Sequence, residues 1–364
     1  MINNIIFIFA SSPSGVRIGK EVSFLKSKGF SLSFVGWNRN NKNFEPNPMF
    51  DDIVTLQRGG NKSGKILPML YIVYMVKLFF HLLFRRGLKN QVIFAINFES
   101  AYIVWLVSHF KKVNYIYDIW DELAISHSFP LWLVKAIRRT DAKIRKDSNF
   151  YIHVDENRIS EIDSDNYIIV YNSPLDFFNG SFPTERKIEN TFAVTGWLNN
   201  TRGLESIYEF ALHAPDIKFI VAGGFRQEEF EKKYRSLPNV ECHSFMPQQE
   251  LFKLIWNCRG IFSLYDTKIP INRLAASNKL YDAMMLGVPV IVNNDLAVAG
   301  FVSNNKVGYI VNYDYDESWN DLKEIDERTI RIYGENGRQL FVSRFEFSTM
   351  MESVFMPAFA KYIA

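Results

Sequence analysis

The sequence is poor in cysteine and shows no pattern of metal ligands. Its two cysteines, Cys242 and Cys258, form no C-x-x-C pair, and no cluster of histidine and cysteine has the spacing of a zinc site. The sequence therefore argues against a metal centre and against a disulfide framework. We expect a reduced, cytoplasmic protein that uses neither a metal ion nor a bound cofactor.

Targeting and nucleic-acid signatures are also missing. The N-terminal stretch MINNIIFIFASS has no basic region before its apolar run, so it predicts a first buried strand rather than a signal peptide. The sequence has no internal repeat, no low-complexity segment and no helix-turn-helix, zinc-finger or RNP-type pattern. We expect no nucleic-acid partner.

What the chain does have is a globular composition and a basic first half. Charged residues make up 22% of the sequence and hydrophobic residues 48%. Up to residue 180 there are 22 Lys and Arg against 16 Asp and Glu, and beyond it 20 against 23. At 364 residues the chain fits two domains, each large enough to bury its own core.

Apolar runs alternate with helical patterns along the chain. The predicted strands of a first series are IIFIFA, SLSFVGW, QVIFAI, YIYDI, FYIHV and YIIVY, and those of a second series are TFAVTG, IKFIVAGG, VECHSF, GIFSLY and VPVIV. Such alternation predicts parallel sheets. The expected fold class is α/β, with two doubly wound Rossmann-like domains facing across a cleft.

A stretch rich in turn formers, NSPLDFFNGSFPTERKIEN, separates the two series. We place the first domain at 1–173, a linker at 174–190 and the second domain at 191–346, with a C-terminal helix at 347–364 completing the first domain. In doubly wound sheets, ligands bind beyond the carboxyl ends of the strands, so candidate residues are sought there.

The segment NKLYDAMMLGVPVIVNND holds the clearest candidate site. Its apolar spacing predicts a short helix that begins after the N-cap Ser277 and ends at Gly287, followed by a buried strand. Asn278, Lys279 and Asp282 then lie near the helix N-terminus, where free N–H groups and the helix dipole favour an anion. Alternatively, Lys279 is only solvated and Asp282 only balances the dipole.

Two glycine-rich strand ends precede this segment. In TFAVTGWLNNTRGLE a strand ends at Gly196 and a helix follows Arg202 and Gly203; arginine can clamp phosphate oxygens, and glycine lets a ligand approach the backbone. IKFIVAGG ends in Gly223 and Gly224. Each feature alone is equally consistent with a capped loop or a turn. Because parallel strands end at one edge of a sheet, the three segments are expected to converge.

These residues resemble the retaining, nucleotide-sugar-dependent glycosyltransferases of the GT-B fold, in a family-four-like form. The likeness rests, in the family's order and spacing, on Gly196, Arg202-Gly203, Lys279-Leu280-Tyr281-Asp282-Ala283-Met284 and Gly287-Val288-Pro289-Val290-Ile291. FAINFES, IYDIWDELA and DSNFYIHVDENRI are similar to landmarks of the family's N-terminal domain.

Four positions depart from the family pattern. Leu274 stands where the family often has a first glutamate, and Asp282 replaces the second. Trp197 replaces an arginine, and Trp120 replaces a histidine. A bacterial surface-polysaccharide subgroup also lacks the first glutamate, so its loss does not indicate inactivity.

The resemblance implies transfer of a sugar from a nucleotide-sugar donor to a growing, lipid-linked glycan, with retention of the anomeric configuration. Arg202 and Lys279 would neutralise the diphosphate, where charge grows as the sugar–phosphate bond breaks. Asp282 would accept hydrogen bonds from the ribose. The remaining candidate binding residues are Gly15, Gly196, Gly203, Gly223, Gly224 and Asn278.

In the first domain, polar residues follow two predicted strands. Asn97, Glu99, Asp118 and Asp121 are expected to look into the cleft, whereas Arg17 is interpreted as a surface charge. An enzyme that inverts the anomeric carbon instead needs a carboxylate base, and Asp121 or Glu99 would serve. A nucleotide-sugar 2-epimerase and a non-catalytic sugar-nucleotide-binding protein stay open as further alternatives.

An apolar stretch at 67–84 raises the question of a membrane. LPMLYIVYMVKLFFHLLF approaches the length of a spanning helix, but Lys77 and His81 interrupt it, and a spanning helix would split the first series. Basic residues flank it on both sides: Arg58, Lys62, Lys65, Arg85, Arg86 and Lys89. We expect a crossover helix that, with the basic stretch 131–146, attaches the first domain peripherally to the anionic cytoplasmic membrane.

Overall fold

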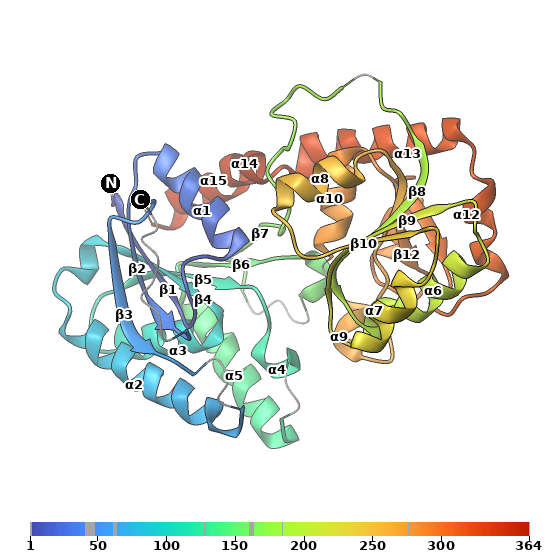
Figure 1. The fold of residues 1–364 in the computed structure, drawn as a ribbon. Helices are drawn as coiled ribbons and strands as arrows, with labels where there is room; N and C mark the ends of the chain where they lie inside the picture. The colour runs from blue at the N-terminus through green and yellow to red at the C-terminus, as the bar shows by residue number, and fades with distance from the viewer. Residues whose placement is uncertain are drawn as a thin grey trace. The chain divides into compact units, whose positions relative to one another are not determined.

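The computed structural model describes residues 2–40, 48–60, 64–126, 129–159, 164–183, 185–275 and 277–363. The chain divides into two compact units. The N-terminal unit comprises Met1–Tyr171 and Met350–Ala364, and the C-terminal unit comprises Asn172–Thr349. Figure 1 shows a separate sheet with flanking helices in each unit. Lys62, one of the basic residues beside the apolar stretch, lies outside the described residues.

The N-terminal unit is organised around a parallel sheet. Within the described residues its seven strands are β1 (Asn4–Phe9), β2 (Ser31–Asn38), β3 (Asp52–Arg58), β4 (Val92–Ile96), β5 (Asn114–Ile119), β6 (Phe150–His153) and β7 (Tyr167–Ile169). Their spatial order is β3-β2-β1-β4-β5-β6-β7, and neighbouring strands are parallel. The direction of winding reverses between β1 and β4, which is the usual place for a ligand in such sheets.

Helices cover both faces of this sheet (Figure 1). They are α1 (Val16–Ser27), α2 (Leu67–Phe84), α3 (Asn97–Ser108), α4 (Leu123–Ser126), α5 (Leu131–Asp147) and α15 (Met356–Tyr362), with the short 3₁₀-helices η1 (Gly64–Ile66), η2 (Leu88–Asn90) and η3 (Glu156–Arg158) and the π-helix η7 (Met351–Phe355). Ile6 and Ile8 of β1 belong to a core shared with α2, α3 and α5. Phe7 stacks on Phe94, which contacts Phe355 of η7, so the C-terminal segment packs within the N-terminal unit.

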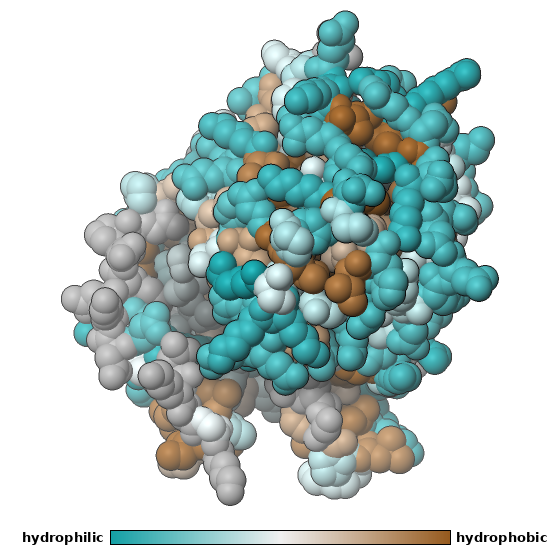
Figure 2. Space-filling model, turned by 45° about the vertical axis from the view of Figure 1, so that its right-hand side comes forward, coloured by the Kyte–Doolittle hydropathy of each residue, from teal (hydrophilic) through white to brown (hydrophobic). Residues whose placement is uncertain are grey.

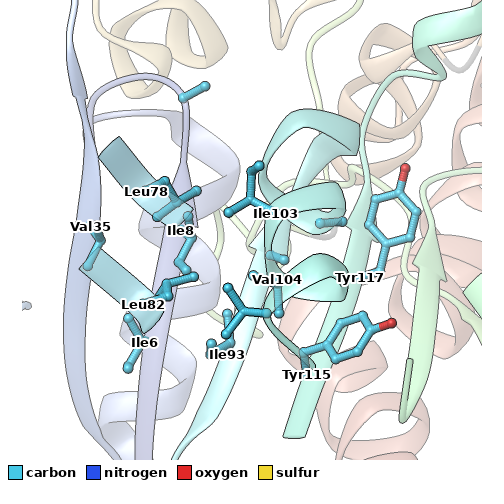
Figure 3. Close-up of a cluster of buried hydrophobic side chains, with 14 of the residues drawn as sticks. Ile6, Ile8, Val35, Leu78, Leu82, Ile93, Ile103, Val104, Tyr115 and Tyr117 are labelled. Atoms are coloured by element: carbon cyan, nitrogen blue, oxygen red, sulfur yellow. The ribbon is translucent and has the colours of Figure 1, made fainter. Parts of the chain in front are cut away.

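The core beneath α2 and α3 is continuous and almost entirely apolar. Figure 3 shows Leu78 and Leu82 of α2 beside β1 and β2, and Val104 of α3 near β4. At its border the hydroxyl of Tyr117 donates to Asp141 Oδ1 at 2.7 Å. The tyrosine ring is thus buried while its polar tip keeps a partner, as buried aromatic hydroxyls require.

The C-terminal unit repeats this design. Within the described residues its strands are β8 (Glu189–Leu198), β9 (Lys218–Phe225), β10 (Val240–His243), β11 (Cys258–Phe262), β12 (Val290–Asn293) and β13 (Gly308–Val311), in the parallel order β10-β9-β8-β11-β12-β13. Its helices and turns are η4 (Asn200–Arg202), α6 (Leu204–Leu212), α7 (Glu228–Arg235), α8 (Gln248–Ile255), α9 (Pro270–Arg273), α10 (Asn278–Leu286), α11 (Ala299–Asn304), η5 (Glu317–Trp319), α12 (Asp321–Glu324), α13 (Glu327–Leu340), η6 (Phe341–Phe345) and α14 (Phe347–Met350). Here the winding reverses between β8 and β11.

The predicted α/β class with two parallel, doubly wound sheets is confirmed. Two strands, β3 and β13, were not predicted. β3 is an edge strand whose residues are mostly half-buried, so it lacks the continuous apolar run of a central strand. β13 has only 4 residues, too few to show a period.

Candidate functional site

The strand ends beside the switch point of the C-terminal sheet are shaped by paired glycines. Gly196 of β8 has φ +92° and pairs with Gly223 of β9. A Cβ on Gly223 would lie 1.9 Å from the carbonyl oxygen of Gly196, so no side chain fits there. Gly223 is therefore required by backbone packing, and Gly196 by its left-handed conformation.

Lys279 lies over Gly196. A Cβ built on Gly196 would be 3.6 Å from Lys279 Nζ, an ordinary contact distance. The lysine stands in the first turn of α10, and α10 follows β11, so its N-terminus opens on the carboxyl edge of the sheet. Among the described residues Lys279 makes no ion pair, which leaves its charge available at this edge.

The N-terminus of α10 carries no side-chain cap. Ser277 occupies the N-cap and Gly287 ends the helix at φ +63°, both as the sequence predicts. The hydroxyl of Ser277 is 2.6 Å from Ser263 Oγ instead of capping the helix. The N–H of Leu280 bonds to the carbonyl oxygen of Ser277 at 3.1 Å, and no side chain among the described residues caps the N–H groups before it. Such a helix N-terminus favours an anion.

Arg202 is held close to the end of β11. Its guanidinium lies 3.9 Å above the ring of Tyr265, which follows β11, and its Nη1 is buried without a hydrogen bond among the described residues. A buried guanidinium N–H without a partner is costly, so this atom points to a missing acceptor. Gly203, the next residue, has φ +70° and packs so tightly on Leu264 that a Cβ would clash.

The other candidate residues of this unit have different surroundings. The ring of Phe245 packs on Gly224 and lies 2.3 Å from where a Cβ would be, so the glycine makes room for that ring. Asn278 is exposed and Asp282 half-buried, one turn beyond Lys279 along α10. Trp197 is exposed, and its ring meets Phe245 edge-on at 4.9 Å.

The carboxyl edge of the N-terminal sheet presents carboxylates. Asn97 begins α3 with φ +61°, and its Oδ1 accepts the backbone N–H groups of Trp120 at 3.0 Å and Asp121 at 3.3 Å. Arg158 Nη1 donates to Asp121 Oδ1 at 3.0 Å. A left-handed, non-glycine residue that clamps a neighbouring loop is the kind of local strain found at functional sites.

Glu99 was predicted at the end of a strand and lies in the first turn of α3. Burial raises the pKa of its carboxyl to about 6; the Asp121 carboxylate adds to the rise, and the Arg39 guanidinium opposes it. This raised pKa brings the carboxyl closer to the operating pH, which suits a proton acceptor in catalysis. Gly15, at the N-cap of α1, has φ −72° and only ordinary neighbours, so nothing in the backbone there requires glycine.

Two predictions for this unit are wrong. Arg17 is a buried cation and not a surface charge, because its Nη2 lies 3.1 Å from Asp118 Oδ1 and its Nε 2.9 Å from Glu21 Oε1. Asp118 is fully buried in this network instead of facing a ligand, and it also accepts the indole N–H of Trp120. Burial, with the Asp118 charge, raises the pKa of Glu21 well above its usual range.

Sequence reasoning missed this network because a single arginine near a strand end carries no signal of burial. The network holds Trp120 beside the carboxyl edge of the N-terminal sheet. Its indole N–H donates to Asp118, and its ring centroid lies 4.9 Å from that of Phe9. No group of three or more His, Cys, Asp or Glu side chains that could hold a metal ion occurs among the described residues.

Comparison with known proteins shows a likeness in structure. No protein-family model and no curated protein matches the sequence. Sucrose-phosphate synthase from Thermosynechococcus elongatus is similar over 99% of this chain and 100% of its own, at 12% identity and TM-score 0.70. Anabaena HepE, in complex with UDP and glucose, is similar over 97% and 98%, at 12% identity and TM-score 0.67. WaaG, a glycosyltransferase involved in lipopolysaccharide biosynthesis, is similar over 99% and 100%, at 13% identity and TM-score 0.62.

The same fold also occurs outside the transferases. A Listeria monocytogenes protein assigned as a UDP-N-acetylglucosamine 2-epimerase is similar over 100% of this chain and 97% of its own, at 7% identity and TM-score 0.62. The fold by itself thus leaves the reaction to be argued from the residues at the strand ends. The chain has the two-domain, Rossmann-like GT-B fold of these glycosyltransferases.

Proposed function

We propose that this protein is a glycosyltransferase that takes a sugar from a nucleotide-sugar donor bound at the carboxyl edge of the C-terminal sheet. The observation that carries the proposal is the position of Lys279 over Gly196, at an uncapped helix N-terminus. Arg202, with its unpartnered Nη1, adds a second cation. Two cations and a helix N-terminus without a side-chain cap, at one strand edge, suit a diphosphate, and HepE with UDP and glucose supports that ligand class.

The same groups account for the reaction. Breaking the bond between the anomeric carbon and the phosphate oxygen leaves its electron pair, and hence negative charge, on the nucleoside diphosphate. Lys279 and Arg202 stabilise that charge as it grows, because they are already in place before the bond breaks. Asp282 accepts hydrogen bonds from the ribose. We propose retention, in which the leaving phosphate assists the acceptor hydroxyl.

The proposed acceptor is a growing, lipid-linked glycan of a bacterial surface polysaccharide, bound by the N-terminal unit in the cytoplasm. The likeness to WaaG, which acts in lipopolysaccharide biosynthesis, supports an envelope glycan. We propose that no metal ion and no bound cofactor take part.

An inverting transferase is the second candidate, favoured by one observation. The pKa of Glu99, raised to about 6, gives a carboxylate that can accept the proton of the attacking hydroxyl at neutral pH. Asp121 is the weaker choice for that role, because its carboxylate is paired with Arg158.

The test uses radiolabelled UDP- and GDP-sugars with a lipid-linked acceptor extract. We expect transfer or slow donor hydrolysis, with the product's anomeric configuration read by NMR. Lys279→Ala should lower the signal by at least about tenfold, and Lys253→Ala, an exposed lysine on α8 of the same unit, should not. Isomerised sugar without transfer would identify a 2-epimerase, and binding without turnover would identify a non-catalytic protein; either result contradicts the proposal.

A further inference from the structure

Helix α2 of the N-terminal unit has two apolar faces. One face is buried: Tyr74, Leu78 and Leu82 enter the core, and Figure 3 shows the two leucines beside the sheet. Yet only 17% of the 18 residues are buried, although the helix is long and apolar enough to cross a membrane by length and composition. A core helix with one buried stripe should be polar on its other side.

The other side of α2 is apolar instead. Large side chains that are each at least half exposed recur every three or four residues along it, and they are Met69, Ile72, Val76, Phe80 and Phe84. This spacing keeps them in one stripe along the solvent side of the helix. On the face of the molecule in Figure 2, by contrast, hydrophilic residues prevail and hydrophobic ones show in separate groups.

A groove widens this outer stripe. It lies between α2 and α3, has a volume of about 350 Å³ and is open to solvent. Its lining is apolar except for one phenol: Ile72, Met75, Val76, Phe79, Phe80, Tyr102, Ile103 and Leu106. Phe110, just beyond α3, is exposed and meets Phe79 edge-on. Together, the outer stripe and the groove form one contiguous surface, which we call the α2 face.

Charge around the α2 face is predominantly positive. Between Asp52 and Glu99 the sequence has no acidic residue and 7 basic ones. Lys77 is exposed beside the outer stripe, and Arg86 and Lys89 are exposed just past the end of α2. In the same layer, α5 begins with exposed Leu131 and Trp132 and carries six basic against two acidic residues.

We propose that the α2 face docks on the surface of a bilayer that contains anionic phospholipid. The outer stripe enters the boundary between headgroups and acyl chains, while the basic residues around it contact the headgroup phosphates. Long lysine and arginine side chains reach such phosphates while their stems stay on the apolar surface.

Two other occupants fit less well. A spanning α2 would leave the sheet, and Tyr74, Leu78 and Leu82 would vacate the core that they fill. A second copy of this chain would bring the same basic rim against itself, because a two-fold interface uses the same surface patch on both copies. Like charges at such an interface are repelled, whereas anionic headgroups are attracted.

The docking proposal deepens the proposed function, since a lipid-linked acceptor would be met at this surface, but its test is independent of any sugar donor. The protein is sedimented with phosphatidylcholine vesicles, with and without phosphatidylglycerol, in the absence of nucleotide. We expect binding to the anionic vesicles at low salt, falling steeply towards about 1 M salt, where the Debye length is about 3 Å.

Two variants separate the charge from the apolar stripe. Arg86→Glu with Lys89→Glu should lower the partition coefficient by about tenfold or more. Its matched control is Lys253→Glu with Arg328→Glu, two exposed basic residues of the C-terminal unit with the same change of charge. The triple variant Ile72→Gln, Val76→Gln, Phe80→Gln should also lower vesicle binding by about tenfold or more. Its control, Leu212→Gln with Ile332→Gln, changes exposed apolar residues of the C-terminal unit and should bind vesicles normally.

We expect donor hydrolysis to be unchanged in the charge variant and in the triple Gln variant. We expect vesicle binding to be unchanged in Lys279→Ala. Loss of hydrolysis in Lys279→Ala with normal vesicle binding therefore tests the proposed function separately. A wild-type protein that stays in the supernatant with both kinds of vesicle would overturn the docking proposal. So would a wild-type dimer in analytical ultracentrifugation that the triple Gln variant dissociates while vesicle binding is absent.

Discussion

The two units share one topology and differ in the chemistry at the strand ends. In both, parallel strands wind outwards from a central switch point, between β1 and β4 in one unit and between β8 and β11 in the other. The C-terminal edge holds two cations, Lys279 over Gly196 and Arg202 over the ring of Tyr265. The N-terminal edge holds the carboxyls of Glu99 and Asp121, and Asp121 is paired with Arg158.

This difference shows how one fold provides two kinds of half-site. The sheets supply only position, because the edge of a parallel sheet gathers the loops that follow its strands. The charge of each half-site is decided by a few residues in those loops. A cationic edge suits a diphosphate, and a carboxylate edge suits sugar hydroxyl groups, so the predictions below ask whether each edge depends on the residues that set its charge.

The largest effect is expected on the stability of the N-terminal unit. Arg17→Ala would leave the buried carboxyls of Asp118 and Glu21 without their cation, at a cost of about 3–5 kcal/mol of unfolding free energy. Amide hydrogen exchange, which reports each unit separately, measures it. The matched control is Arg338→Ala, which breaks an ion pair with Asp176 and should lower the stability of the C-terminal unit alone. Equal loss in both units from either variant would contradict the comparison.

The second effect concerns the cationic edge. Lys279→Ala and Arg202→Ala should each lower the rate of transfer by at least about tenfold, because each stabilises charge that grows in the transition state. The melting temperature should change little, since neither side chain makes an ion pair among the described residues. Near-normal turnover in both variants would remove the site assignment.

A third effect follows from the pKa of Glu99. Because the folded pKa of about 6 lies above the ordinary 4.5, the folded protein binds this proton more tightly than the unfolded chain, and stability falls as the pH rises through that window. Glu99→Gln removes this loss and should stabilise the protein at pH 7 by up to about 2 kcal/mol, with little change at pH 4. Thermal unfolding at the two pH values measures it.

The same variant tests the two stereochemical candidates. Under retention, Glu99→Gln should lower the rate of transfer by less than about tenfold, because the leaving phosphate assists the acceptor. A loss of about 10² or more, with an acidic limb near pH 6 that the variant abolishes, would instead assign Glu99 as the base of an inverting enzyme.

The smallest effect is expected at Asp282. Asp282→Asn keeps one hydrogen-bond acceptor for the ribose, so the dissociation constant of the nucleoside diphosphate should rise by about fivefold, with folding unchanged. Isothermal titration calorimetry with UDP and GDP measures it. An unchanged constant for both nucleotides would show that this residue does not touch the donor.

Local signals in the sequence sufficed for much of the fold. Alternating apolar runs predicted parallel sheets, because buried strands and crossover helices each have their own period. Ser277 and Gly287 marked the ends of α10 correctly, since a cap and a left-handed stop depend only on the residues beside them. The edge strand β3 was not predicted, because a half-buried strand shows no continuous apolar run.

Only the tertiary structure decided which residues meet and which are covered. Lys279 lies over Gly196 because β8 and β11 are neighbours in the sheet, although the two residues are far apart in sequence. Arg17 is buried because β5 and α1 close around it, which no single segment reveals. The sequence predicts that α2 is an apolar helix, but the composition of a helix does not show which of its sides other elements bury. Burial depends on the neighbouring elements, and these leave the outer stripe of α2 exposed.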